Sequence, residues 1–466
     1  MQIPIINGIY TDEASDFRTS YPKNLIPVPK EQGISKGYLR PADGIVSFGT
    51  GPGIDRGGIN WDGVYYRVMG TKLVSIDNTG TATTIGDVGG STQVAIDYSF
   101  DYMAIASNNQ LWLYDGTTLT QNTDPDLGTV LDVIFVDGYF MTTDGEYLVI
   151  TELGNPFAVD PFKYGSSEVD PDPIKGLLKL RNEPVALNRY TIEFFDNVGS
   201  SGFPFQRIEG AQIQRGVVGT HCACVFLDNI AFLGSGRSES PAVWLASSGQ
   251  SIKISTREID QIIQGYAEDQ LELVVVEAKV DKGHQHLFIH FPDQTLVYDG
   301  AASQAMQVPV WFSLSTSLTG TAQYKARNFV WCYDKWLVGD PTEARHGYFT
   351  NELSSHYGEV NGWEFGTTII YNNGMGALFH ELELVCLTGR AALGDDPTII
   401  TQYSLDGEAW SMEKMRTAGK IGERNKRIVW LNQGNMRNWR MQRFKGTSDA
   451  HLSMARLEAR LEPLEV

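Results

Sequence analysis

The chain has 466 residues, 48 glycines and a formal net charge of −19 at pH 7. Its length can bury a large core, and two domains are expected because all-β architectures use many residues per domain. The negative charge argues against nucleic-acid binding over most of the surface, since phosphate binding requires clustered cations.

The N-terminal segment, residues 1–40, is rich in Pro, Asn, Asp and Ser and shows little apolar periodicity. We expect an extended arm that lies over the domain or reaches a neighbouring chain. The opening residues lack the basic and apolar regions of a secretory signal, and no apolar run approaches the roughly 20 residues of a membrane span. These features predict a protein made soluble in the cytoplasm, with no membrane span.

Residues 41–361 contain a recurrent β unit. A strand that ends in a polar turn recurs at intervals of roughly 37–53 residues, the range expected for a four-stranded propeller blade. The strands start at Lys72, Gln110, Glu146, Thr191, Ala242, Thr295 and Gly347. This spacing predicts a β-propeller of seven blades, or alternatively six, in an all-β chain. A series of unrelated hairpins in β-sandwiches remains the alternative.

One short helix is predicted within the propeller, from Thr256 to about Ala267. Thr256 suits an N-cap, and Glu258 favours the positive end of the helix dipole. Ile259, Ile262, Ile263 and Tyr266 recur with helical spacing and form one apolar face. We expect this helix to seal an edge of the ring or to contact a partner.

Residues 362–466 change in pattern. Five segments alternate apolar and polar residues between turns, which predicts a C-terminal antiparallel β-sandwich. In SLDGEAW (Ser404 to Trp410), Asp406 and Gly407 resemble the Asp-box turn of sialidase-like propellers. The motif occurs once and outside the propeller, so a hairpin turn with Trp410 packed beneath it is the preferred interpretation.

The sequence offers no metal site that we would predict. His284, His286 and His290 share parity and would lie on one face of a strand, where they could hold a metal. The sequence Phe291-Pro292 that follows favours an ordinary strand end. The four cysteines (Cys222, Cys224, Cys332 and Cys386) lack a zinc-type spacing, so buried free thiols are expected.

No catalytic residue or cofactor is predicted either. GTGPGIDRGG (Gly49 to Gly58) is interpreted as a turn-rich loop, because it lacks the GK[ST] ending of a phosphate-binding loop. Asp170 and Asp172 are interpreted as surface carboxylates in a proline-rich loop. No nucleophile elbow is present.

The C-terminal 56 residues are basic, with twelve Lys and Arg against six Asp and Glu, whereas the preceding 410 residues carry a net charge of −25. Arg with Trp is enriched in contact patches. A possible subunit or partner interface comprises Arg424, Lys426, Arg427, Arg437, Trp439, Arg440 and Arg443. Solvated strand faces and nucleic-acid binding remain alternatives.

The segment from Val243 to Trp311 carries a family resemblance. It contains SSGQ, then STREIDQIIQGY, then GH, FPDQTLVYD and a Trp. With GYLRP (Gly37 to Pro41), this order resembles the packaged-DNA stabilisation proteins of short-tailed bacteriophages, which are tail-hub proteins.

The resemblance implies a virion tail protein and no enzyme. Such hubs form a hexameric ring below the portal and its adaptor, hold tail fibres or tailspikes and a tail needle or nozzle, and help to retain packaged DNA. The DNA would pass through the channel without sequence-specific binding, and an acidic channel would repel phosphate. A propeller glycosidase or carbohydrate-binding protein is one alternative. A nozzle protein of another short-tailed phage lineage is the other.

Overall fold

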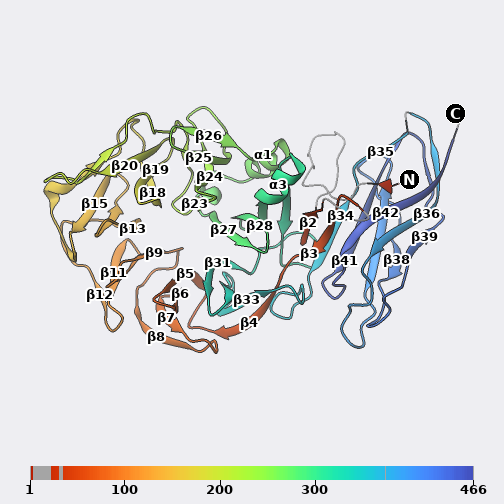
Figure 1. Ribbon diagram of the computed structural model, residues 1–466, viewed down its shortest axis with the longest axis horizontal. Helices are drawn as coiled ribbons and strands as arrows, with labels where there is room; N and C mark the ends of the chain where they lie inside the picture. The colour runs from red at the N-terminus through yellow and green to blue at the C-terminus, as the bar shows by residue number, and fades with distance from the viewer. Residues whose placement is uncertain (1, 4–21, 31–34, 373, 465–466) are drawn as a thin grey trace.

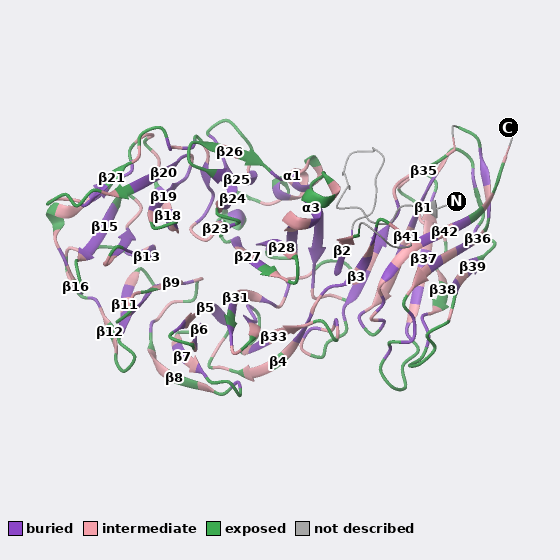
Figure 2. Ribbon diagram, viewed as in Figure 1, coloured by how far each residue is buried: buried purple, intermediate pink, exposed green. Residues whose placement is uncertain are grey.

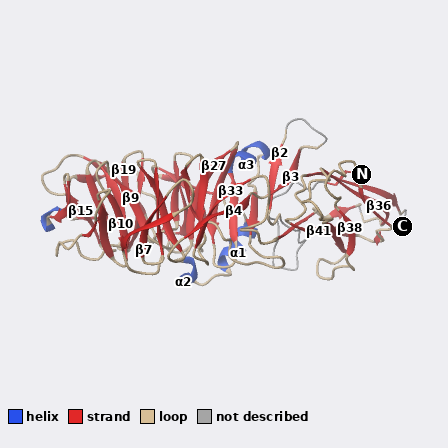
Figure 3. Cartoon of the chain, turned by 90° about the horizontal axis from the view of Figure 1, so that it is seen from below, coloured by secondary structure: helices blue, strands red, loops and turns tan. Residues whose placement is uncertain are grey.

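The computed structural model describes residues 2–3, 22–30, 35–372 and 374–464, and these residues are mostly β-strand. Seven small sheets form a ring, and a two-sheet sandwich lies beside it (Figure 1). The prediction of a seven-bladed propeller followed by a C-terminal β-sandwich is therefore confirmed. Figure 3 shows the ring as a disc with the sandwich extending from its side.

The first four blades follow one another along the chain, each with its first strand at the centre of the ring. Blade 1 consists of β5 (Asp55–Trp61), β6 (Val64–Met69), β7 (Lys72–Ile76) and β8 (Ala82–Asp87). Blade 2 consists of β9 (Ala95–Tyr98), β10 (Met103–Ser107), β11 (Gln110–Tyr114) and β12 (Leu119–Gln121). Blade 3 consists of β13 (Asp132–Val136), β14 (Tyr139–Thr143), β15 (Tyr147–Glu152) and β16 (Asn155–Val159), with β17 (Gly165–Ser166) also paired to β15. Blade 4 consists of β18 (Ile174–Leu180), β19 (Glu183–Asn188), β20 (Ile192–Asn197) and β21 (Phe205–Arg207).

The remaining three blades complete the ring. Blade 5 consists of β22 (Gly216–Val217) and β23 (Ala223–Phe226), both paired to β24 (Asn229–Ser235), then β25 (Ala242–Ser247) and β26 (Gln250–Lys253). Blade 6 consists of β27 (Val275–Asp281), β28 (His284–His290), β29 (Thr295–Asp299) and β30 (Trp311–Leu314). Blade 7 consists of β31 (Arg327–Cys332), β32 (Lys335–Gly339), β33 (Arg345–Thr350) and β4 (Gly44–Thr50).

Blade 7 closes the ring with a strand from the other end of the propeller sequence. β4 pairs antiparallel with β33, with Tyr348 opposite Val46 and Phe349 opposite Ile45. β4 is the outermost strand of blade 7, so the start of the propeller sequence is joined to its last blade.

The turns between the first two strands of most blades have one conformation. Both turn residues have positive φ, as in the type I′ turns that match the twist of hairpin strands. This holds in six blades, at Asp62-Gly63, Asp137-Gly138, Arg181-Asn182, Leu227-Asp228, Lys282-Gly283 and Tyr333-Asp334. The repeated turn keeps the inner hairpins in the same register around the ring.

The hydrophobic core of the propeller lies between neighbouring blades. Val68 and Leu73 of blade 1, for example, share a buried cluster with Met103 and Ile105 of blade 2. Similar clusters join the other neighbouring blades, and the largest extends over blades 4, 5 and 6. Burial in Figure 2 follows these blade faces, so the ring is held by apolar contact between sheets.

The sandwich has two antiparallel sheets around its own core. The first contains β2 (Leu25–Pro29), β3 (Gly37–Pro41), β42 (Met454–Pro463), β36 (Ala377–Cys386) and β39 (Ile428–Leu431), with β1 (Gln2–Ile3) and β40 (Asn435–Met436) also paired to it. The second contains β34 (Gly362–Gly366), β41 (Trp439–Thr447), β37 (Thr398–Ser404) and β38 (Lys414–Thr417), with β35 (Ile370–Tyr371) also paired to β41.

The N-terminal segment differs from the extended arm that the sequence predicts. β2 and β3 form a hairpin, and Leu39 of β3 pairs with Met454 of the sandwich. Ile26 of the same hairpin lies in a cluster with propeller residues, including Phe288 and Phe312. The hairpin therefore ties the two folds together, because its apolar residues are buried on both sides. The remainder of the predicted arm, residues 1, 4–21 and 31–34, lies outside the described residues.

The predicted helix is present as α1 (Arg257–Gln264), with Thr256 as its N-cap. It is not the sole inserted helix, because α2 (Glu268–Leu271), α3 (Gly300–Met306) and the 3₁₀ turn η1 (Pro161–Lys163) also occur. The sequence predicts a polar turn after the strand that starts at Thr295, whereas Asp299 at the end of that strand caps α3. Within the described ranges, no helix has the length and apolarity needed to cross a membrane.

Candidate functional site

The centre of the propeller is a narrow, polar channel. Its walls are the first strands of the blades, and it encloses a cavity of about 360 Å³. Residues of six blades line it, among them Asp97, Asp132, Leu177, Ala223, Glu277 and Asn328. The backbone of each first strand faces the channel as a sheet edge, so its N–H groups need partners.

Carboxylates supply those partners across the blade boundaries. The N–H of Phe135 in blade 3 donates to Asp97 of blade 2 (2.7 Å), and the N–H of Leu177 in blade 4 donates to Asp132 of blade 3 (2.7 Å). Glu277 of blade 6 accepts the N–H groups of blade 7 in the same way, at residues 328 and 329 (3.0 and 2.8 Å). These acidic side chains fasten neighbouring inner strands at three of the blade boundaries.

Asp132 is the most perturbed of these carboxylates. Burial raises its pKa to about 7, and the hydrogen bonds from the N–H groups of Leu177 and Val133 offset only part of that effect. Lys179 lies 3.5 Å from Asp97 and donates to the carbonyl oxygen of Phe135 (2.7 Å). These side chains therefore have a structural role, since their polar atoms form hydrogen bonds with backbone groups.

The junction between blades 7 and 1 contains a buried ion pair. Asp55 and Arg67, both in blade 1, pair with fully buried side chains. Arg67 also donates to the hydroxyl of Tyr65 and to the carbonyl oxygen of Asn328 in blade 7 (both 2.6 Å), and the amide of Asn328 donates to Asp55 (2.6 Å). The pair thus joins blade 1 to strand β31 of blade 7.

Sequence reasoning missed this junction because Asp55 lies in the glycine-rich stretch interpreted as a loop. Gly57 and Gly58 belong to strand β5, and Gly49 belongs to β4. Glycine is needed at Gly49, because an added Cβ would lie 2.0 Å from the carbonyl oxygen of Gly80. The adjacent charges of Asp55 and Arg56 within a glycine-rich strand were the available signal.

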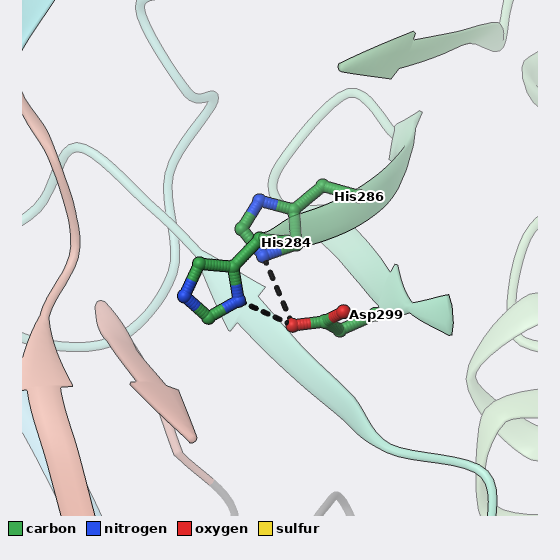
Figure 4. Close-up of side chains that lie close together, drawn as sticks. All are labelled: His284, His286 and Asp299. Atoms are coloured by element: carbon green, nitrogen blue, oxygen red, sulfur yellow. Dashed lines mark hydrogen bonds and ion pairs between the residues drawn. The ribbon is translucent and has the colours of Figure 1, made fainter. Parts of the chain in front are cut away.

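Two of the three predicted histidines meet at one carboxylate (Figure 4). His284 Nδ1 lies 2.7 Å from Asp299 Oδ2, and His286 Nε2 lies 3.3 Å from the same oxygen. His290 does not join them, since its Nε2 lies 2.7 Å from Glu277. Burial alone would raise the pKa of Asp299, but hydrogen bonds with His284 and His286 hold it well below its usual range.

The cysteines are free thiols, of which Cys222 and Cys332 are buried as predicted, whereas Cys224 and Cys386 are half-buried. Cys222 is buried and its Sγ donates to the carbonyl oxygens of Leu271 and Val274 (both 3.3 Å). Burial raises the pKa of Cys222 to about 12, so it stays protonated and unreactive at neutral pH. The neighbouring His221 has a pKa lowered to about 4, with burial as the main cause.

The basic residues predicted as an interface lie in several places on the sandwich. Arg424 and Arg437 are exposed, and Arg427 is exposed with its Nε 2.7 Å from Glu383. Lys426 is half-buried and lies 3.3 Å from Glu423. This part of the set can take part in a surface contact.

The other members lie against or inside the sandwich. Arg440 is fully buried between the rings of Phe379 and Tyr403, at 4.2 and 3.9 Å, and so cannot form part of a surface. Arg443 is half-buried over the ring of Trp410 (3.9 Å), and Trp439 is also half-buried. Successive side chains of β41 point to opposite faces of the sheet. Basic residues that are close in sequence therefore lie partly inside the sandwich and partly on its surface.

The other sequence motifs have structural roles. Asp406 accepts the N–H groups of Glu408 and Ala409 and closes a turn between β37 and β38. Asp170 pairs with Arg237 (2.7 Å). Asp172 accepts the N–H of Tyr190 (2.5 Å), so neither aspartate of the proline-rich loop is a lone surface carboxylate.

Family comparisons account for both folds. Residues 1–354 match the family described as Bacteriophage P22 Gp10, beta-propeller, and residues 362–462 match the one described as Bacteriophage P22 Gp10, beta-sandwich. The fold thus defines a structural protein of a phage tail, not an enzyme, and a component of the virion. The chain belongs to the P22 Gp10 family of packaged-DNA stabilisation and tail hub proteins.

A curated relative agrees with this assignment over the full length. The chain is 28% identical to the "Tail hub protein gp10" of Salmonella phage P22, across 99% of both sequences. The resemblance stated from the segment Val243 to Trp311 is therefore confirmed. The glycosidase alternative is excluded, since the family is one of structural tail hub proteins, and the hub reading replaces the nozzle alternative.

Solved structures show more distant likenesses. The chain is 8% identical to the N-terminal domain of Nup159, with a TM-score of 0.40, over 75% of this chain and 100% of that one. It is 10% identical to the Pan2 WD40 domain of Neurospora crassa, with a TM-score of 0.41, over 66% of this chain and 95% of that one.

Proposed function

We propose that six copies of this chain form a ring that extends the portal–adaptor channel of a short-tailed phage and helps to retain the packaged DNA. In this proposal the ring also carries the tail fibres or tailspikes and the tail needle or nozzle. The observation that supports it most is the match of both folds, in the same order, to the tail hub family over the length of the chain.

The propeller channel is too small to admit duplex DNA, which supports a conduit that lies between several copies of the chain. Its cavity of about 360 Å³ is comparable to a small-molecule pocket. Duplex DNA cannot enter a space of this size, and the carboxylates that join the inner strands would have to separate first. A passage for DNA therefore has to lie between copies, outside the propeller.

The charge of the chain supports a channel that does not hold DNA tightly. The first 410 residues carry a net charge of −25. Such a surface repels phosphate, so a genome could slide past it. We expect no tight binding of duplex DNA by the assembled hub at about 0.15 M salt, as measured by fluorescence anisotropy. Tight binding under these conditions would contradict this part of the proposal.

The exposed basic residues of the sandwich are proposed as a contact with an acidic surface of a neighbouring copy or ring. The change that tests this is the double substitution Arg424→Glu and Arg437→Glu, because both side chains are exposed. Arg181→Glu, in an exposed turn of blade 4, is the matched control.

The experiment is assembly on purified portal–adaptor complexes, followed by light scattering after size exclusion. We expect six copies of the wild type and of the control to bind each complex, and the double variant to bind less. Equal assembly of all three proteins would contradict the role of the basic residues. Failure of the wild type to bind portal–adaptor complexes would contradict the hub proposal itself.

A further inference from the structure

A cluster of metal-ligating side chains lies on the two middle strands of blade 6, where β28 begins and β29 ends. Three ligand atoms, Nδ1 of His284, Nε2 of His286 and Oδ2 of Asp299, lie within 4.8 Å of one another. The histidines are the first and third residues of β28, so both side chains lie on one face of the strand. Asp299 belongs to the neighbouring strand β29 and lies directly opposite His286 (Figure 4).

The two oxygens of Asp299 have separate roles. Oδ1 accepts the N–H groups of Ala301 and Ala302 (3.0 and 3.1 Å) and caps α3. Oδ2 faces the two imidazoles, so the helix cap fixes the carboxylate without occupying this oxygen. A ligand held by its other oxygen is oriented in advance, as metal ligands usually are.

The imidazoles are also held in place. Their rings stack at 4.9 Å, and the ring of His286 contacts the edge of Phe312 at 5.4 Å. His286 is only 6% exposed, and its Nε2 faces Asp299 Oδ2 at 3.3 Å. The three ligand atoms are therefore held close together by the surrounding strands before any ion binds.

We propose that His284, His286 and Asp299 bind one divalent transition-metal ion of the zinc class, with a water molecule as the fourth ligand. Tetrahedral zinc with bonds of about 2.0–2.2 Å separates its ligand atoms by about 3.3–3.5 Å. The 3.3 Å between His286 Nε2 and Asp299 Oδ2 meets this requirement. The 2.7 Å between His284 Nδ1 and the same oxygen widens by roughly 0.6 Å when an ion replaces the shared proton.

The surroundings are compatible with a cation. Lys279 lies close to His286, but it is paired with Asp43 (3.3 Å) and Asp281 (3.5 Å). Asp43 also pairs with Arg40 (2.8 Å). With Asp299 included, these five groups sum to one negative charge, which a divalent ion can offset. His284 keeps 13% of its side chain exposed and follows a two-residue turn, which leaves an entry path.

The site lies close to the hairpin of β2 and β3, which connects the propeller and the sandwich. Helix α3, which Asp299 caps, contacts strand β2 of the hairpin that joins propeller and sandwich. Phe312, which contacts His286, belongs to the same buried cluster as Ile26 of that hairpin. A bound ion would therefore stabilise this connection. Loss of the ion would destabilise the connection before it destabilised the blades.

The test is a calorimetric titration of the chelator-treated full-length chain with Zn²⁺, paired with absorption spectra after addition of Co²⁺. We expect one equivalent to bind, a visible d–d band from tetrahedral Co²⁺, and a rise in melting temperature of a few degrees. His284→Asn should weaken binding by more than the roughly 10–100-fold that the loss of a supporting residue costs.

The matched control is His380→Asn, because His380 is exposed on the sandwich and lies 2.9 Å from Glu462. This variant should bind the metal as the wild type does. Without metal, His284→Asn should melt like the wild type, which separates a lost ligand from a lost fold. Absence of a stoichiometric site in the wild type, or equal binding by His284→Asn, would overturn the proposal.

Discussion

At the residue scale, the buried Arg56 is held by carbonyl oxygens and a hydroxyl, and its hydrogen bonds to the described residues include no carboxylate. Arg56 donates to the carbonyl oxygens of Thr92, Gly70 and Gly89 and to the hydroxyl of Ser107. A guanidinium offers five donors in a rigid plane, so a single side chain can satisfy several segments at once. Arg56 thereby joins blade 1 to blade 2.

Arg440 provides the first prediction. It is fully buried, donates to the carbonyl oxygen of Gln433 (2.6 Å) and to the side chain of Gln442 (2.8 Å), and has its pKa lowered to about 10, mainly by burial. Arg440→Ala should lower the free energy of unfolding of the sandwich by about 3–5 kcal/mol, since it leaves a cavity and buried acceptors. Chemical denaturation measures this change.

The control for Arg440 is Arg437→Ala, three residues earlier and exposed. It should change the free energy of unfolding by less than about 0.5 kcal/mol. Equal effects of the two substitutions would contradict the buried role of Arg440.

Asp132 gives a pH dependence. Because burial raises its pKa to about 7, the folded chain keeps a proton that the unfolded chain releases near pH 4. Its contribution to the free energy of unfolding therefore falls as the pH rises from about 4 to 7, by roughly 4 kcal/mol at most. Urea unfolding of the wild type and of Asp132→Asn across this range should show a difference that changes with pH. A constant difference would contradict the raised pKa.

Sequence alone could identify the basic residues but not their directions. Arg440 and Arg443 lie three residues apart on β41, and only the register of the strand in its sheet places one inside and the other over Trp410. The meeting of His284 and His286 with Asp299 was similarly hidden, because the strand pairing of β28 with β29 creates it.

At the element scale, α1 packs against blade 5. Ile259 and Ile263 are fully buried in the largest cluster of the propeller, and the helix contacts β25. Replacing both with Asp should leave little soluble protein, because it buries charge in an apolar seam. Ile252→Asp, on β26 and 68% exposed, is the control and should remain soluble. Unchanged melting of the double variant would show that α1 does not seal the ring.

Strand β4 controls ring closure. Gly49→Ala places a Cβ 2.0 Å from the carbonyl oxygen of Gly80, so the backbone must shift where β4 meets blade 1. We expect a loss of about 1–3 kcal/mol in the free energy of unfolding, the usual cost of overpacking. Gly202→Ala is the control, since a Cβ there meets nothing within 4 Å. Comparable denaturation midpoints for both variants would contradict the close approach.

The elements themselves were largely predictable. All seven strands recognised by their spacing are the third strand of a blade (β7, β11, β15, β20, β25, β29 and β33), because each alternates apolar residues and ends in a polar turn. Helix α3 was missed because Asp299-Gly300 has the composition of a turn. Its capping by Asp299 and its alanines were the available helix signal.

At the scale of the whole molecule, the long-range pairings escaped prediction. β4 pairs with β33 almost 300 residues later, and the hairpin of β2 and β3 joins a sheet that also contains β42, β36 and β39 from the C-terminal region. No local pattern specifies such partners, since they depend on which sheet edges remain open after the rest of the chain has folded. The consequence is a chain whose two folds share one N-terminal segment.

We propose that this chain works as a ring of copies around a DNA passage, since the cavity of the propeller channel is only about 360 Å³. The most direct test is cryo-electron microscopy of the purified chain bound to its portal–adaptor complex. The account predicts six copies at the end of the adaptor, with a continuous channel between them and with each propeller closed. Density for DNA or an open passage through the centre of a propeller, or a single copy on the axis, would contradict it.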